Sequence, residues 1–496
     1  MAKKRRGNKD DSKPQKKKKS EIYCPKKDLI TIEEIFARFP NLGEGIFGKL
    51  DDRSLVSCRE VNKTWKEYVD SQRIYWIRKI LIYANSQSKF HEEWKRVLDK
   101  TPVETLKEFA RFVWLQPQQE TSPLNVAGAM GNIELFNSIK EKTGLNEDSK
   151  NNHGMTAFHN AAYNNRINLC KVIIDKVQDK NPGNKFGETP LHLAAVRGNS
   201  LLCKLIMEKI QGKNPRSNRG VTPLHQAASK GHFYTCQVIM EKLQDIDINP
   251  RCKNGQTPLH MAAMKGHLKV CQLIIEKGAN ISPRNKSGNT PLQHAAFEGH
   301  LKICQLIMER VQNKNPCNKR DETPLHYAAK NGHYDVCSLI LDKVDAKNPK
   351  DQIGSTPLHV AASNGHVNIC QLIFEKIAGP ELPRLRSSKP LKKVYGINPG
   401  NGKGLTPLHH AASLGHFEVC KFLSLNLKEK NPKDEVGATP LHLAAKSGHL
   451  DVCKLLCSNL EEKNPLDVYG RTPLDNASSN KHWKIVHFLI VENNLN

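Results

Sequence analysis

Histidine and cysteine recur in this 496-residue chain at a spacing that could bind a metal. The motif Gly-His-x-x-x-Cys occurs seven times, for example at His232 with Cys236 and at His267 with Cys271. Residues four apart share one face of a helix, so each copy could supply two ligands. A structural zinc ion needs four ligands at about 2.0–2.3 Å, whereas packed helices lie about 8–10 Å apart. We therefore expect histidines that hydrogen-bond between neighbouring segments, and no metal site.

The cysteines keep one register. Nine of the 14 lie 14 residues after a recurring threonine, at Cys170, Cys203, Cys236, Cys271, Cys304, Cys337, Cys370, Cys420 and Cys453. A disulfide needs Cα atoms within about 7 Å, which is closer than neighbouring helices pack. We expect these cysteines to be small core residues in a reducing compartment.

Other chemistry is not indicated. The sequence has no glycine-rich phosphate loop, no Ser-His-Asp arrangement and no metal-binding cluster outside the register above, so we expect no catalytic residues and no cofactor. A run of about 18 apolar residues is missing, so no membrane span is expected. The charged N-terminus is not followed by an apolar stretch, which argues against a secretory signal and favours the nucleus, the cytoplasm or both.

The threonines belong to a repeated motif, Thr-Pro-Leu-His, with close variants. They fall at Thr156, Thr189, Thr222, Thr257, Thr290, Thr323, Thr356, Thr406, Thr439 and Thr472, mostly 33 residues apart, and a weaker copy begins at Ser122. Self-similarity at this period is typical of stacked units and not of one globular core.

One unit shows the physics of the repeat. Thr189 suits a helix N-cap and Pro190 the first helical position. Gly198 can end that helix in the left-handed conformation. A second helix with apolar residues over 202–206 follows, and Asn214-Pro215 ends it. Helices of two to three turns are marginal alone, so the units must bury their faces against one another.

These motifs resemble the ankyrin repeat. The resemblance covers residues 121–496 as about eleven units, with a Pro-rich, basic insertion at about 378–397 that we expect to be an exposed loop. It implies a mainly α solenoid in which each unit has two antiparallel helices and a short β-hairpin. The terminal units differ from the pattern at Asn125, Asp475 and Lys481, as capping units should.

In the ankyrin family the first helix of each unit and the hairpin tips line a concave groove. By that resemblance, a central partner-binding patch would consist of Met261, Met264, His294, Phe297 and Tyr327. Aromatic and methionine side chains are good interface anchors. Ordinary packing between units is the alternative.

The expected tips carry a charge gradient. Basic residues crowd the middle units at Arg216, Arg219, Arg251, Lys253, Arg284, Lys286, Lys319 and Arg320, whereas Asp351, Asp434, Glu435 and Asp467 come later. A basic stripe would favour an acidic protein partner. The alternative is a solvated surface without a partner.

The N-terminal tail, residues 1–27, accounts for +9 of the chain's net charge of +26 and should be disordered. Its two basic clusters, Lys3, Lys4, Arg5 and Arg6, then Lys16, Lys17, Lys18 and Lys19, are typical of a two-part nuclear import signal. A tail that contacts nucleic acid and a tail that only improves solubility are the alternatives.

Residues 32–80 resemble the F-box motif through Pro40, Ile46, Phe47, Leu50, Leu55, Val61 and Trp65, whose spacing suits short amphipathic helices. The resemblance implies docking on the Skp-type linker of a cullin ubiquitin ligase. Gly43, Gly45 and Gly48 depart from it, since glycine weakens a helix. The alternative is a helical cap on the solenoid. Residues 81–120 should form further helices that join this region to the first repeat.

The sequence therefore favours a non-catalytic adaptor, with an F-box-like region that selects a ligase and an ankyrin array that binds a protein substrate. The alternative is an ankyrin scaffold without a ligase role, nuclear or associated with nucleic acid.

Overall fold

The computed structural model describes residues 76–77, 79–81, 91–99, 101–114, 122–243, 248–378, 398–427, 429–460 and 462–492. Every regular element within these ranges is an α-helix. Among the described residues, α6 (His91–Leu98) and α7 (Val103–Trp114) precede the repeats. Short helical stretches at 76–77 and 79–81 come before them.

Eleven helix pairs follow, and in each pair an inner helix precedes an outer helix. The inner helices are α8 (Pro123–Met130), α10 (Ala157–Tyr163), α12 (Pro190–Val196), α14 (Pro223–Lys230), α16 (Pro258–Met264), α18 (Pro291–Glu298), α20 (Pro324–Lys330), α22 (Pro357–Ser363), α24 (Pro407–Ser413), α26 (Pro440–Ser447) and α28 (Pro473–Ser479). The outer helices are α9 (Ile133–Thr143), α11 (Ile167–Lys176), α13 (Ser200–Lys209), α15 (Phe233–Leu243), α17 (Leu268–Glu276), α19 (Leu301–Met308), α21 (Tyr334–Lys343), α23 (Val367–Ala378), α25 (Phe417–Asn426), α27 (Leu450–Cys457) and α29 (Trp483–Glu492).

The inner helices begin where the motif predicts. Ten of the eleven begin at a proline, whose missing N–H costs nothing in the first turn. In α12 the preceding Thr189 has extended φ and ψ angles and forms a reciprocal capping box with His192. Each helix therefore begins at a residue fixed by the Thr-Pro-Leu-His motif.

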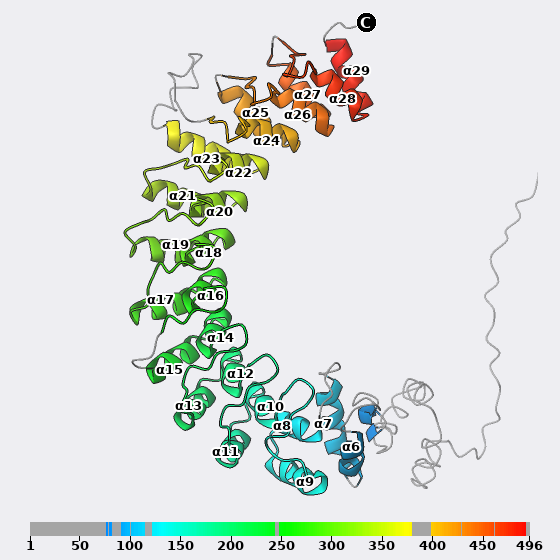
Figure 1. Cartoon of the computed structure of the whole chain (residues 1–496), viewed down its shortest axis with the longest axis vertical. Helices are drawn as coiled ribbons and strands as arrows, with labels where there is room; N and C mark the ends of the chain where they lie inside the picture. Colours follow the sequence, from blue (N-terminus) through cyan, green and yellow to red (C-terminus); the bar gives the residue numbers. More distant parts are fainter. Residues whose placement is uncertain are drawn as a thin grey trace, which may run out of the picture.

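The array bends toward its inner helices, which line the concave side of the arc in Figure 1. Their contact surfaces are built from alanine, since Ala194 and Ala195 of α12 are fully buried and all other units except the first and the last keep the same pair. The outer helices bury larger residues, such as Leu202 and Ile206 of α13. Because small side chains allow the inner helices to approach more closely, the stack curves around them.

One hydrophobic core runs through the described part of the chain, from Ile80 to Leu489. In its first part, α6 packs on α9 and α7 packs on α8. Trp94 and Phe109, both fully buried, meet edge to face with ring centroids 5.4 Å apart. The region predicted to be a helical linker is therefore a packed cap on the first repeat.

The hairpins between helix pairs are tight tips. In one of them the N–H of Ser217 donates to the carbonyl of Val221 at 2.9 Å, and the N–H of Asn218 donates to Phe186 of the preceding tip at 2.8 Å. One hydrogen bond within a tip and one to the preceding tip do not make a β-ladder. The expected hairpins are therefore present as turns, and no described residue lies in a strand. Among the described helices, none combines the length and the apolar character that crossing a membrane requires.

Candidate functional site: the inner helices and hairpin tips

The histidine of each Thr-Pro-Leu-His motif joins its unit to the next. In α12 the backbone N–H of Thr189 donates to Nδ1 of His192 at 3.2 Å. Nε2 of His192 donates to the carbonyl of Val221, in the following hairpin, at 2.9 Å. Seven other histidines make the same contact with a following hairpin, namely His159, His225, His260, His326, His359, His409 and His442.

One unit shows which nitrogen carries the proton. At Gln293 the side-chain oxygen accepts from the N–H of Thr290 at 2.8 Å, and the side-chain nitrogen donates to the carbonyl of Glu322 at 2.8 Å. An amide can fill the histidine position only if the position needs one acceptor and one donor. The histidines are therefore neutral, with the proton on Nε2. Burial lowers the pKa of His192 to about 4, against the opposing effect of its bond to Val221.

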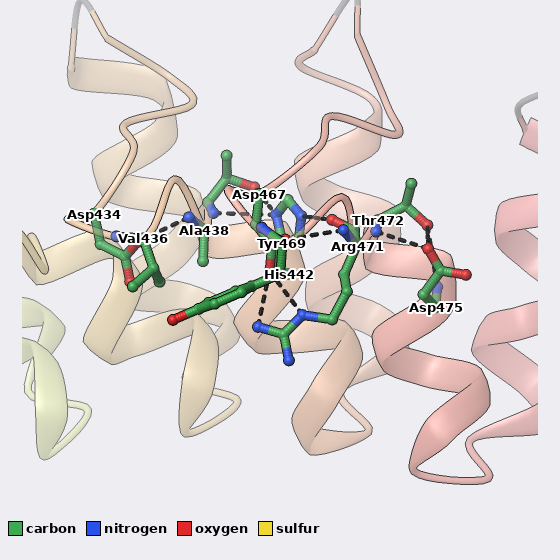
Figure 2. Close-up of polar contacts among 10 residues, drawn as sticks. Asp434, Val436, Ala438, His442, Asp467, Tyr469, Arg471, Thr472 and Asp475 are labelled. Carbon is green, nitrogen blue, oxygen red and sulfur yellow. Dashed lines mark hydrogen bonds and ion pairs between the residues drawn. The ribbon is translucent and has the colours of Figure 1, made fainter.

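The first and the last of the described units have another residue in place of this histidine. Asn125 in the first unit donates its amide to the carbonyl of Met155 in the next hairpin at 3.0 Å. Asp475 in the last unit accepts from the N–H of Thr472 at 2.8 Å, as Figure 2 shows. A carboxylate accepts but does not donate, so Asp475 keeps the contact with the N–H of Thr472 and cannot make the donor contact that His192 makes with Val221.

A second set of histidines lies just before the outer helices. Each of them hydrogen-bonds to the preceding unit. Nε2 of His232 donates to the carbonyl of Val196 at the end of the preceding inner helix, at 3.0 Å. The equivalents are His267, His300, His333, His366, His416, His449 and His482. Arg166 takes this position in an early unit and donates Nε to Ala129 at 2.7 Å. The expectation that these histidines tie units together is confirmed.

The cysteines of the Gly-His-x-x-x-Cys motif lie in the core. All nine in-register cysteines are free, and their exposure is 0%. Burial raises the pKa of each of these thiols to about 12, so they carry almost no thiolate. Within the described ranges, no three His, Cys, Asp or Glu side chains are grouped so that they could hold a metal ion.

The five predicted groove residues lie on three consecutive inner helices. Met261 and Met264 are in α16, His294 and Phe297 in α18, and Tyr327 in α20. Phe297 is exposed and the other four are half-buried. The three helices line the concave side of the array (Figure 1), and none of the five side chains is fully buried.

Phe297 and Tyr327 contact each other, with ring centroids 5.9 Å apart and planes at 71°. The Tyr327 hydroxyl lies 3.2 Å from Oδ1 of Asn289 and 3.0 Å from a carboxylate oxygen of Glu322, and it accepts from Asn318 at 3.0 Å. Burial raises the pKa of this phenol, and the Glu322 charge adds to the effect. These contacts fix the position of the Tyr327 ring within the patch.

All eight predicted basic tip residues are exposed. Three of them, Arg216, Arg251 and Arg284, occupy the position after the proline that opens each tip. Each donates to a backbone carbonyl in the following tip, which for Arg216 is that of Arg251 at 2.8 Å. These contacts were not predicted, because a backbone acceptor in the next unit leaves no mark in the sequence.

The acidic residues of the later tips have a structural role. Oδ1 of Asp467 accepts from the N–H groups of Tyr469 and Arg471 at 2.9 Å each, and Oδ1 of Asp434 accepts from Val436 and Ala438 (Figure 2). In earlier tips an asparagine makes the same contacts. Burial raises the pKa of Asp467, but hydrogen bonds from Arg471 and Tyr469 outweigh it and hold the pKa below its usual value. Part of the charge gradient therefore reflects turn geometry.

Other predictions fall outside the described residues. These are the F-box-like positions Pro40, Ile46, Phe47, Leu50, Leu55, Val61 and Trp65, the import clusters at 3–6 and 16–19, and most of the insertion at 378–397. They stay predictions from the sequence.

Comparison with known families agrees with this architecture. A family model of ankyrin repeats in three copies matches residues 158–252, 240–316, 305–384 and 408–496, and a model of the F-box domain matches residues 33–77. No curated protein matches the chain.

The buried contacts recur from unit to unit, whereas the exposed residues differ between units. This combination is typical of a scaffold that recognises other molecules. The ankyrin matches cover more than half of the sequence, so the chain belongs to the ankyrin repeat family, and it carries an F-box domain before the array. Both are non-catalytic interaction modules. The chain is therefore a protein-interaction adaptor.

Proposed function

We propose that this protein is the substrate receptor of a cullin-type ubiquitin ligase. Its F-box region would dock on the Skp-type linker of the ligase, and its ankyrin array would hold a protein substrate for a conjugating enzyme carried by the complex. The observation that carries the proposal is the F-box match at 33–77, which ends where the packed cap of the array begins.

The described residues support a firm connection between the two modules. Trp76 and Ile77, the last residues of the F-box match, are half-buried and pack against the hydrophobic core. Ile80 is fully buried in the same core, which continues through α6 and α7 into the repeats. The last residues of the F-box match therefore belong to the same packed core as the array.

Capture by an immobilised, purified Skp-type linker tests the proposal. We expect the full-length chain to be retained, and the variant with Leu55→Ala and Trp65→Ala to be retained much less while its thermal unfolding is nearly unchanged. Leu425→Ala with Trp483→Ala is a matched control, because it removes the same residue types from positions 65% and 63% exposed in the array. Equal capture of the Leu55/Trp65 variant, with intact folding, would contradict the docking role and leave a scaffold without a ligase.

We also propose that the protein enters the nucleus, which the basic clusters at 3–6 and 16–19 support. A fluorescently tagged full-length chain should move toward the cytoplasm when both clusters are replaced by alanine. An unchanged distribution would contradict this import role.

A further inference from the structure

Three arginines form a regular row along the middle tips. Arg216, Arg251 and Arg284 follow Pro215, Pro250 and Pro283, so they hold equivalent positions in three consecutive tips. The row is fixed by backbone contacts. Nη1 of Arg216 donates to the carbonyl of Arg251 at 2.8 Å, and Nη1 of Arg251 donates to that of Arg284 at 2.6 Å.

The last member is held in the same way, because Nη1 of Arg284 donates to the carbonyl of Cys317. Arg251 and Arg284 also reach a carbonyl of their own tips, at Gly255 and Gly288. All of these bonds use Nη1, and no hydrogen bond among the described residues uses Nε or Nη2 of the three. Each guanidinium is thus held in place, keeps its charge and presents unused donors.

The surroundings of the row are one-sided in charge. The three tips 216–221, 251–256 and 284–289 contain six Lys or Arg residues and no Asp or Glu. Within the described part of the chain, no ion pair neutralises the three arginines. The next tip, 317–322, adds Lys319 and Arg320 but also carries Asp321 and Glu322. An approaching anion would therefore meet an unbalanced positive strip.

The spacing of the row restricts what could bind along it. Adjacent tips are joined by a backbone bond, for example from Lys253 N–H to Arg219 at 2.8 Å. The inner helices that follow these tips, α14, α16 and α18, pack on one another in order, and packed helices lie about 8–10 Å apart, so equivalent residues of adjacent tips recur at about that spacing. A polyproline II segment advances about 3.1 Å per residue with three residues per turn, so every third side chain recurs on one side at about 9.3 Å. A β-strand would alternate its side chains between faces and would not present every third one.

We propose that this arginine row binds an acidic segment of the substrate protein in an extended, polyproline II-like conformation, with a carboxylate at about every third residue. The inference rests on the proposed function, since it names a chemical class for the protein held by the array. Guanidinium groups suit carboxylates because two parallel N–H donors can meet both oxygens. A protein is favoured over nucleic acid because the same units expose Phe297 and the half-buried Met261 and Met264, which can receive apolar side chains of the same partner.

Fluorescence anisotropy with the full-length chain and a labelled peptide of repeated Glu-Pro-Pro, about twelve residues long, tests the row. Arg216→Gln, Arg251→Gln and Arg284→Gln together should weaken binding by about tenfold or more, since exposed ion pairs contribute modestly but three are lost. Lys204→Gln, Lys269→Gln and Lys302→Gln together form the control, because they remove the same charge from exposed positions of the outer helices. This control should weaken binding by less than about twofold at physiological salt.

Two comparison probes complete the design. A peptide of the same composition with its glutamates clustered should bind several-fold more weakly than the periodic peptide. Equal binding of the two peptides, or an equal loss in the outer-helix control, would overturn the proposal. Tighter binding of a single-stranded oligothymidylate, lost with the three arginines, would assign the row to nucleic acid instead. This test is independent of linker capture. The peptide can fail to bind while the linker is still captured, and linker capture can fail while the peptide still binds.

Discussion

His192 can be replaced by glutamine, the residue that the chain itself uses at the equivalent position 293. Gln293 accepts from Thr290 and donates to Glu322, as His192 does with Thr189 and Val221. We therefore expect His192→Gln to keep both contacts at neutral pH, with a change in the free energy of unfolding of less than about 1 kcal/mol. Because glutamine does not titrate, the variant removes only the response of this position to acid.

The size of that response follows from the pKa. Histidine has a pKa of about 6.5 in the unfolded chain, whereas burial holds the pKa of His192 at about 4 in the folded chain. Between these values the unfolded state binds more protons, so stability falls as the pH drops from about 6.5 to about 4 and changes no further below that from this group. From about pH 7.5 to about pH 5 one such histidine costs about 2 kcal/mol.

The assay is urea unfolding of the full-length chain followed by far-UV circular dichroism at about pH 7.5 and about pH 5. His192→Gln should lose about 2 kcal/mol less than the unmodified chain between the two conditions. His192→Ala should lose about 2–4 kcal/mol already at neutral pH, because the N–H of Thr189 and the carbonyl of Val221 are left unpaired. Since a repeat array can unfold unit by unit, the comparison uses the transition that includes α12.

An equal loss of stability on acidification in the glutamine variant and the unmodified chain would refute the reasoning. It would mean that burial does not lower the pKa of His192 in the folded state. Burial also lowers the pKa of four more histidines to about 4, namely His159, His260, His359 and His409. The whole array should therefore be destabilised by mild acid.

The first two of the remaining predictions are tested by urea unfolding, and the third by mass spectrometry of the alkylated protein. Lys481 holds a glycine position with φ +61°, so Lys481→Gly should raise the free energy of unfolding by about 1 kcal/mol, and a lower urea midpoint would count against this strain. Gly198→Ala should cost at least about 2 kcal/mol, because φ is +78° and the new Cβ would lie 2.7 Å from Nδ1 of His232; a neutral change would show that the next unit can shift. Iodoacetamide at mildly alkaline pH should modify the exposed Cys317 well before the buried Cys203, whose pKa burial raises to about 12, and equal rates would show that the units open readily.

Much of the frame was predictable, because one motif carries it ten times. Thr189 and Pro190 predicted the beginning of an inner helix, and α12 begins at Pro190. The constant register of the cysteines predicted burial, and Cys203 is fully buried. Repetition allows this, since a position that recurs in every unit must satisfy the same packing each time.

The details that differ between units were harder to predict. From the sequence, Asp467 could be interpreted only as a negative charge. In the structure it accepts hydrogen bonds from backbone N–H groups of its own turn. The bonds of Arg216 and Arg251 go to backbone carbonyls, which every residue has. Phe297 and Tyr327 belong to inner helices and their rings touch each other, so the sequence could not separate partner binding from packing. A glutamine in a histidine register was the one visible sign of the tautomer.

Both proposals together require that one chain binds a ligase linker and an acidic protein segment at the same time. This can be measured as the affinity of the full-length chain for the Skp-type linker, determined by titration calorimetry with and without a saturating Glu-Pro-Pro peptide. We expect measurable linker binding, unchanged when the peptide is present, and a ternary complex of the summed mass in analytical ultracentrifugation. Competition between linker and peptide, or no binding of the linker by the folded chain, would contradict it.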